Sequence, residues 1–221
     1  MFQNKGFTVV ELLIVIVVIA IVASITITSF KGVTNRAANV ARSDYVRKAY
    51  DQLQTYLTYN GSTNLKASLP ADTYVCLGTG YVDVDPGAGV ACYYDNYNGT
   101  TTIYRSVSGF DAVLSNANTS VTGNFPKYAY KVPSEDFAQT APLYYYSNNP
   151  NYVIDGKPGV YSSISYYLDG ANVDCGVRPI LTYVSTVGSV YNYTARSNAI
   201  NSGYGEFEGA KYTTCEIYTE L

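Results

Sequence analysis

The chain has 221 residues, which is enough for one or two domains with a proper hydrophobic core. Its formal net charge is −3 and it has no block of basic residues, so nucleic acid is not expected as its main partner. Histidine is absent, which removes the commonest general base and metal ligand. The other residues form no convincing catalytic pattern, and we expect neither an enzyme nor a bound cofactor.

A short polar leader and a long apolar stretch open the chain. The leader, residues 1–6, holds one lysine, Lys5, which should keep this end on the cytoplasmic side of a membrane. The uninterrupted apolar run from Leu12 to Ala23 is too short to cross a bilayer, which needs about 20 residues. Including Phe7–Val10 supplies the length but places Glu11 inside the span. A carboxylate there costs about 2.5–3.5 kcal/mol on insertion scales, so its presence needs a reason.

Cleavage after Gly6 would supply that reason. Phe7 would then carry a free ammonium group, and Glu11 lies four residues along on the same helix face. The carboxylate can pair with the ammonium of its own chain or of a neighbouring copy, which would offset most of the cost of burying either charge. We therefore interpret Phe7 and Glu11 as a register device for stacking identical helices.

This stretch closely resembles the amino terminus of type IV prepilins. In that family a short basic leader ends in glycine and is followed by phenylalanine, threonine, two aliphatic residues, glutamate and an apolar run. The corresponding residues here are Gly6, Phe7, Thr8, Val9, Val10, Glu11 and Leu12 onward. The resemblance implies cleavage of the Gly6–Phe7 bond by a prepilin peptidase, methylation of the Phe7 amine, and assembly of the mature subunit into a filament through its helix.

Two simpler interpretations remain open. An ordinary secretory signal would have Lys5 in its basic region and a small-residue cleavage site at residues 21–23. A plain single-span anchor would need no cleavage at all. Glu11 would be a handicap in either, and the residues after Ala23 do not look like the start of a free domain.

The apolar stretch should continue as one long helix to about residue 60, membrane-spanning over about 7–28 and amphipathic over about 30–60. Ser24–Ser29 is rich in β-branched and hydroxyl residues and is a weak helix former. Apolar residues then recur at helical spacing: Phe30, Val33, Ala37, Val40, Val46, Ala49, Leu53, Tyr56 and Leu57. The polar face is expected to carry Lys31, Arg36, Arg42, Asp44, Lys48 and Asp51. Gly61 suits the left-handed conformation that ends a helix.

Residues 61–221 should form a β-rich head. Segments of strand character lie at residues 74–77, 80–84, 90–94, 101–105, 127–132, 143–146, 152–154, 160–168, 180–184, 190–194 and 211–218. Turn dipeptides such as Asn98-Gly99 and Asp169-Gly170 divide them. We expect long loops at 106–125 and 195–208, and an antiparallel sheet laid over the helix. The fold class is therefore α+β, a long helix packed on a sheet as in pilins.

The cysteines Cys76, Cys92, Cys175 and Cys215 are expected to form disulfides in a chain that leaves the cytoplasm. Three pairings are possible, and sequential closure, Cys76 with Cys92 and Cys175 with Cys215, makes the shortest loops. Many pilins carry an exposed cysteine-closed loop near the carboxyl terminus, and Cys175–Cys215 resembles it. Asp83, Asp85 and Asp95 match no dedicated calcium loop, so no metal is expected.

Tyrosine is abundant, with 25 residues, and includes the runs Tyr144–Tyr146 and Tyr166–Tyr167. These side chains could be adhesive at the surface, or could replace aliphatic residues on the sheet faces.

The implied function is that of a structural subunit of a type IV pilus, in adhesion, motility or DNA uptake. The precursor would span the inner membrane once in contact with lipid, and the mature chain would form an extracellular filament. Its partners would be other copies of itself, the prepilin peptidase, the pilus assembly machinery in the membrane, and a possible host or surface ligand. The alternatives are a pseudopilin of a type II secretion or competence system, and a low-copy pilus-borne adhesin.

Overall fold

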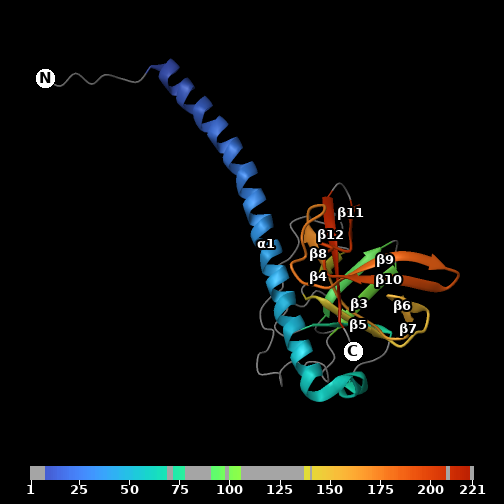
Figure 1. Ribbon diagram of the computed structural model, residues 1–221. Helices are drawn as coiled ribbons and strands as arrows, with labels where there is room; N and C mark the ends of the chain where they lie inside the picture. The colour runs from blue at the N-terminus through green and yellow to red at the C-terminus, as the bar shows by residue number, and fades with distance from the viewer. Residues whose placement is uncertain are drawn as a thin grey trace. The chain divides into compact units, whose positions relative to one another are not determined.

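The computed structural model describes residues 8–68, 72–77, 91–97, 100–105, 137–139, 141–207 and 210–219 (Figure 1). The chain divides into two compact units, Met1–Ala37 and Ala38–Leu221, and each is described by itself. Helix α1 begins in the first unit and ends in the second. All strands belong to the second unit. The predicted layout of one long helix followed by a β-rich domain is confirmed.

Helix α1 runs over Val9–Ser68 and contains one break. The break lies at Gly61, whose φ of 71° and ψ of 166° are not helical. Gly61 was expected to end the helix, but helical structure resumes beyond it to Ser68. Leu65 in this last part is fully buried in the main core, and its burial stabilises the continuation. The weak segment Ser24–Ser29 is helical in this single chain.

The larger sheet has nine strands in the order β1-β5-β8-β12-β9-β10-β6-β7, with β11 paired to β12. Their bounds are β1 Thr73–Cys76, β5 Leu143–Ser147, β6 Tyr152–Ile154, β7 Lys157–Pro158, β8 Tyr161–Asp169, β9 Ile180–Val187, β10 Val190–Arg196, β11 Gly203–Phe207 and β12 Ala210–Tyr218. All pairs are antiparallel except β10 with β6, which is parallel. A smaller sheet pairs β3 (Thr100–Arg105), β2 (Ala91–Tyr97) and β4 (Phe137–Gln139).

Each predicted strand that falls on described residues is a strand in the structure, and those at 80–84 and 127–132 lie outside the described residues. The predicted loop 106–125 also lies outside them. The predicted loop at 195–208 is wrong, because β11 occupies Gly203–Phe207 and pairs with β12. Strand β11 was not predicted because it contains glycines, which disfavour strands. A Cβ atom at Gly205 would lie 2.5 Å from the Tyr212 hydroxyl, so the Tyr212 side chain would have to move to admit a larger residue.

The second half of α1 packs on one face of the larger sheet. Val46, Ala49 and Leu53 are fully buried and share one core with side chains of β5, β8 and β12. The sheet residues of this core are Tyr144, Tyr146, Ile164, Tyr166, Leu168, Cys215 and Ile217. Along each strand these residues occupy every second position, so they lie on one face of the sheet, the face that packs on α1. Tyr144–Tyr146 and Tyr166 thus pack in the interior and are not available as surface adhesive groups.

A buried ionic cluster ties α1 to the end of β8. The Arg42 Nη1 atom lies 3.0 Å from Asp169 Oδ2, and both side chains are almost fully buried. The Asn39 Oδ1 atom accepts hydrogen bonds from Arg42 Nη1 and from the Asp169 backbone N–H, both at 2.9 Å. Arg42 was expected on the solvent face of the helix, and this expectation is wrong. The Asp169 carboxylate, far away in the sequence, supplies the counter-charge that permits its burial.

Two disulfides join parts of the second unit. Cys76 of β1 is bonded to Cys92 of β2, which links the two sheets, with Cα atoms 5.9 Å apart. Cys175, in the segment after β8, is bonded to Cys215 of β12, with Cα atoms 5.8 Å apart. This is the sequential pairing.

Candidate assembly site at the start of the helix

Glu11 lies in the first turn of α1, and its carboxylate is held by Thr8, the residue before the helix. The Thr8 backbone N–H and the Thr8 hydroxyl each donate a hydrogen bond of 2.8 Å to Glu11 Oε2. In return, the Glu11 N–H donates to Thr8 Oγ1 at 3.2 Å. This reciprocal pair is a capping box, which satisfies backbone donors that have no partner at the start of a helix.

Because of the capping box, Glu11 is already stabilised within a single chain. Its carboxylate already accepts two hydrogen bonds within one chain, so part of the cost of placing it in an apolar span is offset before any second copy is present. Among the described residues, no hydrogen bond reaches its other oxygen, Oε1. This contact was not predicted, although a threonine three residues before a glutamate and an apolar run is its recognised sequence signal.

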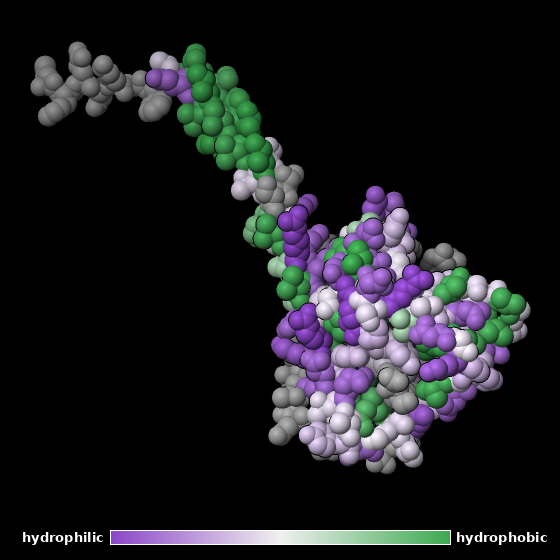
Figure 2. Space-filling view, in the orientation of Figure 1, coloured by the Kyte–Doolittle hydropathy of each residue, from purple (hydrophilic) through white to green (hydrophobic). Residues whose placement is uncertain are grey.

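The surface of α1 around and beyond Glu11 is apolar and exposed over several turns. Figure 2 shows it as a continuous hydrophobic region of the first unit. Large aliphatic residues lie on every side of the helix, each about half exposed or more: Val9, Val10, Leu12, Leu13, Ile14, Val15, Ile16, Val17, Val18, Ile19, Ile21, Val22, Ile25 and Ile27. A helix that is apolar all round needs lipid or other protein around it.

Within residues 8–30, Glu11 is the sole charged residue. Gly6 and Phe7 lie outside the described residues, so the expected cleavage and methylation positions stay predictions. Thr8, which binds the carboxylate, is covalently adjacent to Phe7. Removing residues 1–6 would leave the Phe7–Thr8 bond intact, and the capping box could persist in the mature chain.

Residues 1–27 match the prokaryotic N-terminal methylation motif. The chain carries the type IV prepilin signature. The match spans the leader, the capping box and most of the exposed apolar stretch. No curated protein and no solved structure matches the chain. The prepilin signature, with a helix long and apolar enough to cross a membrane, fits a membrane-anchored precursor of the pilin or pseudopilin class.

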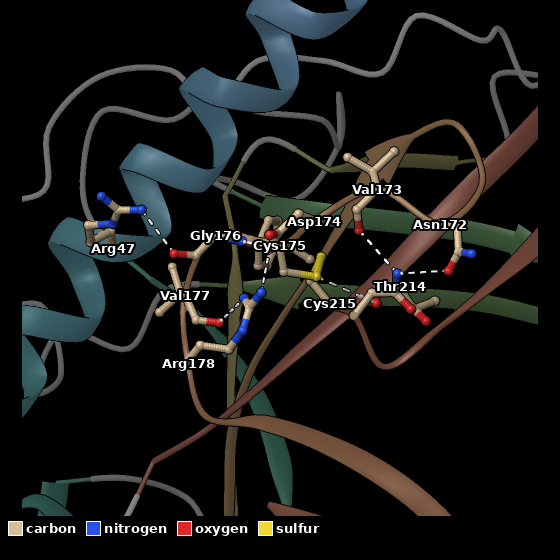
Figure 3. Close-up of polar contacts among 12 residues, drawn as sticks. Arg47, Asn172, Val173, Asp174, Cys175, Gly176, Val177, Arg178, Thr214 and Cys215 are labelled. Atoms are coloured by element: carbon tan, nitrogen blue, oxygen red, sulfur yellow. Dashed lines mark hydrogen bonds and ion pairs between the residues drawn. A yellow bond between two sulfur atoms is a disulfide. The ribbon is translucent and has the colours of Figure 1, made fainter. Parts of the chain in front are cut away.

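The segment closed by Cys175–Cys215 is the other feature that the prepilin resemblance singles out (Figure 3). The Arg47 side chain of α1 donates to the Gly176 carbonyl at 2.9 Å and so attaches this segment to the helix. Asp174 accepts hydrogen bonds from Arg178 at 2.6 Å and from the Gly176 N–H at 2.8 Å. Partial burial alone would raise the pKa of the Asp174 carboxyl, but these donors lower the pKa overall.

No group of three or more potential metal-binding side chains occurs among the described residues. Of the three carboxylates considered for calcium, Asp83 and Asp85 lie outside the part of the chain that the structure describes, and Asp95 is in β2.

Proposed function

We propose that the chain is a structural subunit of a type IV pilus. The observation that carries this proposal is the exposed apolar stretch of α1, whose sole charge within residues 8–30 is Glu11 and most of which lies inside the matched methylation motif. Such a helix can lie in lipid before assembly and among identical helices afterwards. The same apolar surface thus contacts lipid in the precursor and other subunits in the filament. Glu11 gains an ion-pair partner from another subunit only in the filament.

In this proposal the leader 1–6 is removed by a prepilin peptidase and the new Phe7 amine is methylated. Residues 7–60 form the assembly helix and residues 61–221 form the head displayed on the filament surface. The Phe7 ammonium of one subunit pairs with Glu11 of its own or of a neighbouring subunit. The Oε1 atom of Glu11 is the acceptor for it, since Oε2 is already engaged by Thr8.

The proposed location follows from this sequence of states. The precursor sits in the inner membrane with Lys5 on the cytoplasmic side, and the assembly machinery transfers the mature subunit into an extracellular filament. Adhesion, motility and DNA uptake are the uses expected of such a filament.

The experiment that tests the proposal is a substitution at the cleavage position. Gly6→Val should abolish processing, because a peptidase pocket that accepts a residue without a side chain has no room for a branched one. Mass spectrometry of the membrane fraction should find the full chain with its leader, whereas the wild type should begin at N-methylated Phe7. Recovery of chains beginning at Phe7 from the Gly6→Val strain would contradict the proposal.

A pseudopilin or a low-copy adhesin would share the processed amino terminus, so abundance separates these alternatives. Filaments sheared from the cell surface should consist mainly of this chain if it is the major subunit. Trace amounts within a filament made of another protein would favour an adhesin or another minor subunit. Absence from surface filaments, with the processed chain retained in the membrane, would favour a pseudopilin.

A further inference from the structure

The face of the larger sheet opposite α1 contains a pocket of about 410 Å³. Its lining includes the tyrosines Tyr74, Tyr167, Tyr183 and Tyr193, together with hydroxyl side chains and Glu216. Along β8, β9 and β12 these residues alternate with residues of the core shared with α1, so they belong to the opposite face of the sheet. Tyr166 and Cys215 of that core also line the pocket. A concave site with aromatic walls and few polar groups is typical of a ligand-binding site.

Among the described residues that line this pocket, Glu216 is the only charged one. Its Oε1 atom accepts hydrogen bonds from the Tyr161 hydroxyl and from Ser163 Oγ, the latter at 3.0 Å. Both donors come from the neighbouring strand β8 and hold the carboxyl group in one orientation. Burial raises the pKa of the Glu216 carboxyl, while these two donors act in the opposite direction.

The charge of Glu216 has no counter-ion within the described part of the molecule. The ion pairs there join Arg42 to Asp169, Lys48 to Asp44 and Arg178 to Asp174. No hydrogen bond among the described residues reaches its second oxygen, Oε2. Burial disfavours the charged form of this carboxyl group, and a cation bound from solution would stabilise the carboxylate in its place.

The tyrosine rings beside Glu216 can contribute to binding a cation. The Tyr183 and Tyr193 rings meet edge to face, with centroids 5.9 Å apart and an interplanar angle of 74°. Tyr193 in turn lies 5.1 Å from Tyr161, the residue that donates to Glu216. Tyr183 is about half exposed. Aromatic faces attract organic cations, most strongly where water is excluded.

We propose that this pocket binds an organic ammonium group, with Glu216 as the counter-ion and the tyrosine rings as the walls. A neutral saccharide could also stack on tyrosine and bond to hydroxyl groups, but it would supply no counter-charge for the Glu216 carboxylate. The pocket lies wholly within the second unit, and the proposal does not depend on filament assembly.

The test measures binding of choline and of its neutral isostere 3,3-dimethylbutan-1-ol to the full chain in polyoxyethylene detergent micelles, which carry neither amine nor sugar. Saturation-transfer difference NMR gives the dissociation constants. Choline should bind about tenfold more tightly than the isostere or better. n-Butylammonium is the second cationic probe, and the stronger of the two cations shows whether the site prefers a quaternary or a primary ammonium. Methyl galactoside is the saccharide probe.

Two variants and one control locate the site. Glu216→Gln keeps the size and the acceptor for Tyr161 but removes the charge, and should weaken binding of the preferred cation by about tenfold or more. Tyr183→Ala changes a half-exposed ring and should weaken it severalfold. Glu206→Gln removes an equal charge at an exposed position of β11 and should have no effect.

The proposal is overturned if neither ammonium binds, if the neutral isostere binds as well as choline, or if methyl galactoside is preferred. It is also overturned if a folded Glu216→Gln chain binds like the wild type. Should Glu216→Gln fail to fold, as judged by circular dichroism, the Tyr183→Ala variant and the comparison of choline with its isostere decide the question.

Discussion

The two halves of α1 are built for different surroundings. Residues 9–27 expose aliphatic side chains on every side and carry one charge, Glu11. Residues 38–57 are amphipathic, and their apolar face is buried in a core formed with the sheet. The aliphatic side chains of the first half are exposed in the single chain, whereas the apolar face of the second half is buried against other elements of the second unit.

This difference separates assembly from folding. Substitutions in the first half should change where the chain can reside and whether copies associate, with little effect on the unfolding of the head. Substitutions in the second half should change the stability of the head. The following experiments test whether effects on filament assembly and effects on head stability are separate.

The largest effect is expected from Glu11→Gln. The variant keeps the shape of the side chain and can still accept from Thr8, but each incoming Phe7 ammonium would be buried without a counter-charge. Leaving one partner of a buried ion pair alone costs about 3–5 kcal/mol, so the yield of sheared filaments should fall by about 100-fold or more. Thermal unfolding of the head, followed by near-ultraviolet circular dichroism, should not change.

Thr8→Val is the matched control for Glu11→Gln, because it removes the hydroxyl donor of the capping box and leaves the charge. Loss of such a cap destabilises a helix start by about 1 kcal/mol, so filament yield should fall only modestly. Normal yield from Glu11→Gln, or an equal loss from both variants, would show that the charge of Glu11 does not set the assembly register.

In the second half of the helix, Arg42→Ala should be the most damaging substitution. It leaves Asp169 buried without its cation, which typically costs about 3–5 kcal/mol and lowers the melting temperature by roughly 10 °C. Arg36→Ala, at an exposed position six residues earlier, is the control and should have almost no effect. Equal melting temperatures for the two variants would mean that Arg42 is not needed for the packing of the head.

Arg42 also shows where prediction from sequence stops. The helix, most strands and the methylation motif follow from local periodicity and residue type, and these were predicted. The burial of Arg42 depends on Asp169, 127 residues away, and the pocket around Glu216 depends on which strands are neighbours in the sheet. Neither relation leaves a local pattern. Strand β11 was missed because its glycines oppose a strand locally, while pairing with β12 stabilises it.

A smaller loss of stability is expected when the Cys175–Cys215 disulfide is removed by the double substitution to serine. The bond closes a loop with a sequence separation of 40 residues, and such cross-links typically contribute about 2–4 kcal/mol. The melting temperature should fall in both the membrane-bound and the assembled chain. If only the assembled chain were affected, the disulfide would act between subunits and the separation of assembly from folding would fail.

The smallest effect is expected at the ion pair of Asp174 with Arg178, in which the Asp174 side chain is exposed and the Arg178 side chain is partly buried. The pKa of Asp174 is lower in the folded chain than in the unfolded one, so the pair stabilises the fold above the unfolded pKa of about 4. This contribution disappears as the pH falls through the folded value. Asp174→Asn should therefore cost less than about 1 kcal/mol at pH 7, and the two chains should become equally stable once the pH lies below the folded pKa, as judged by denaturant unfolding. A difference that persisted unchanged at low pH would assign the effect to the hydrogen bond with Gly176 and not to the charge. A difference as large as that of Arg42→Ala would show that exposure does not separate strong from weak ion pairs in this head.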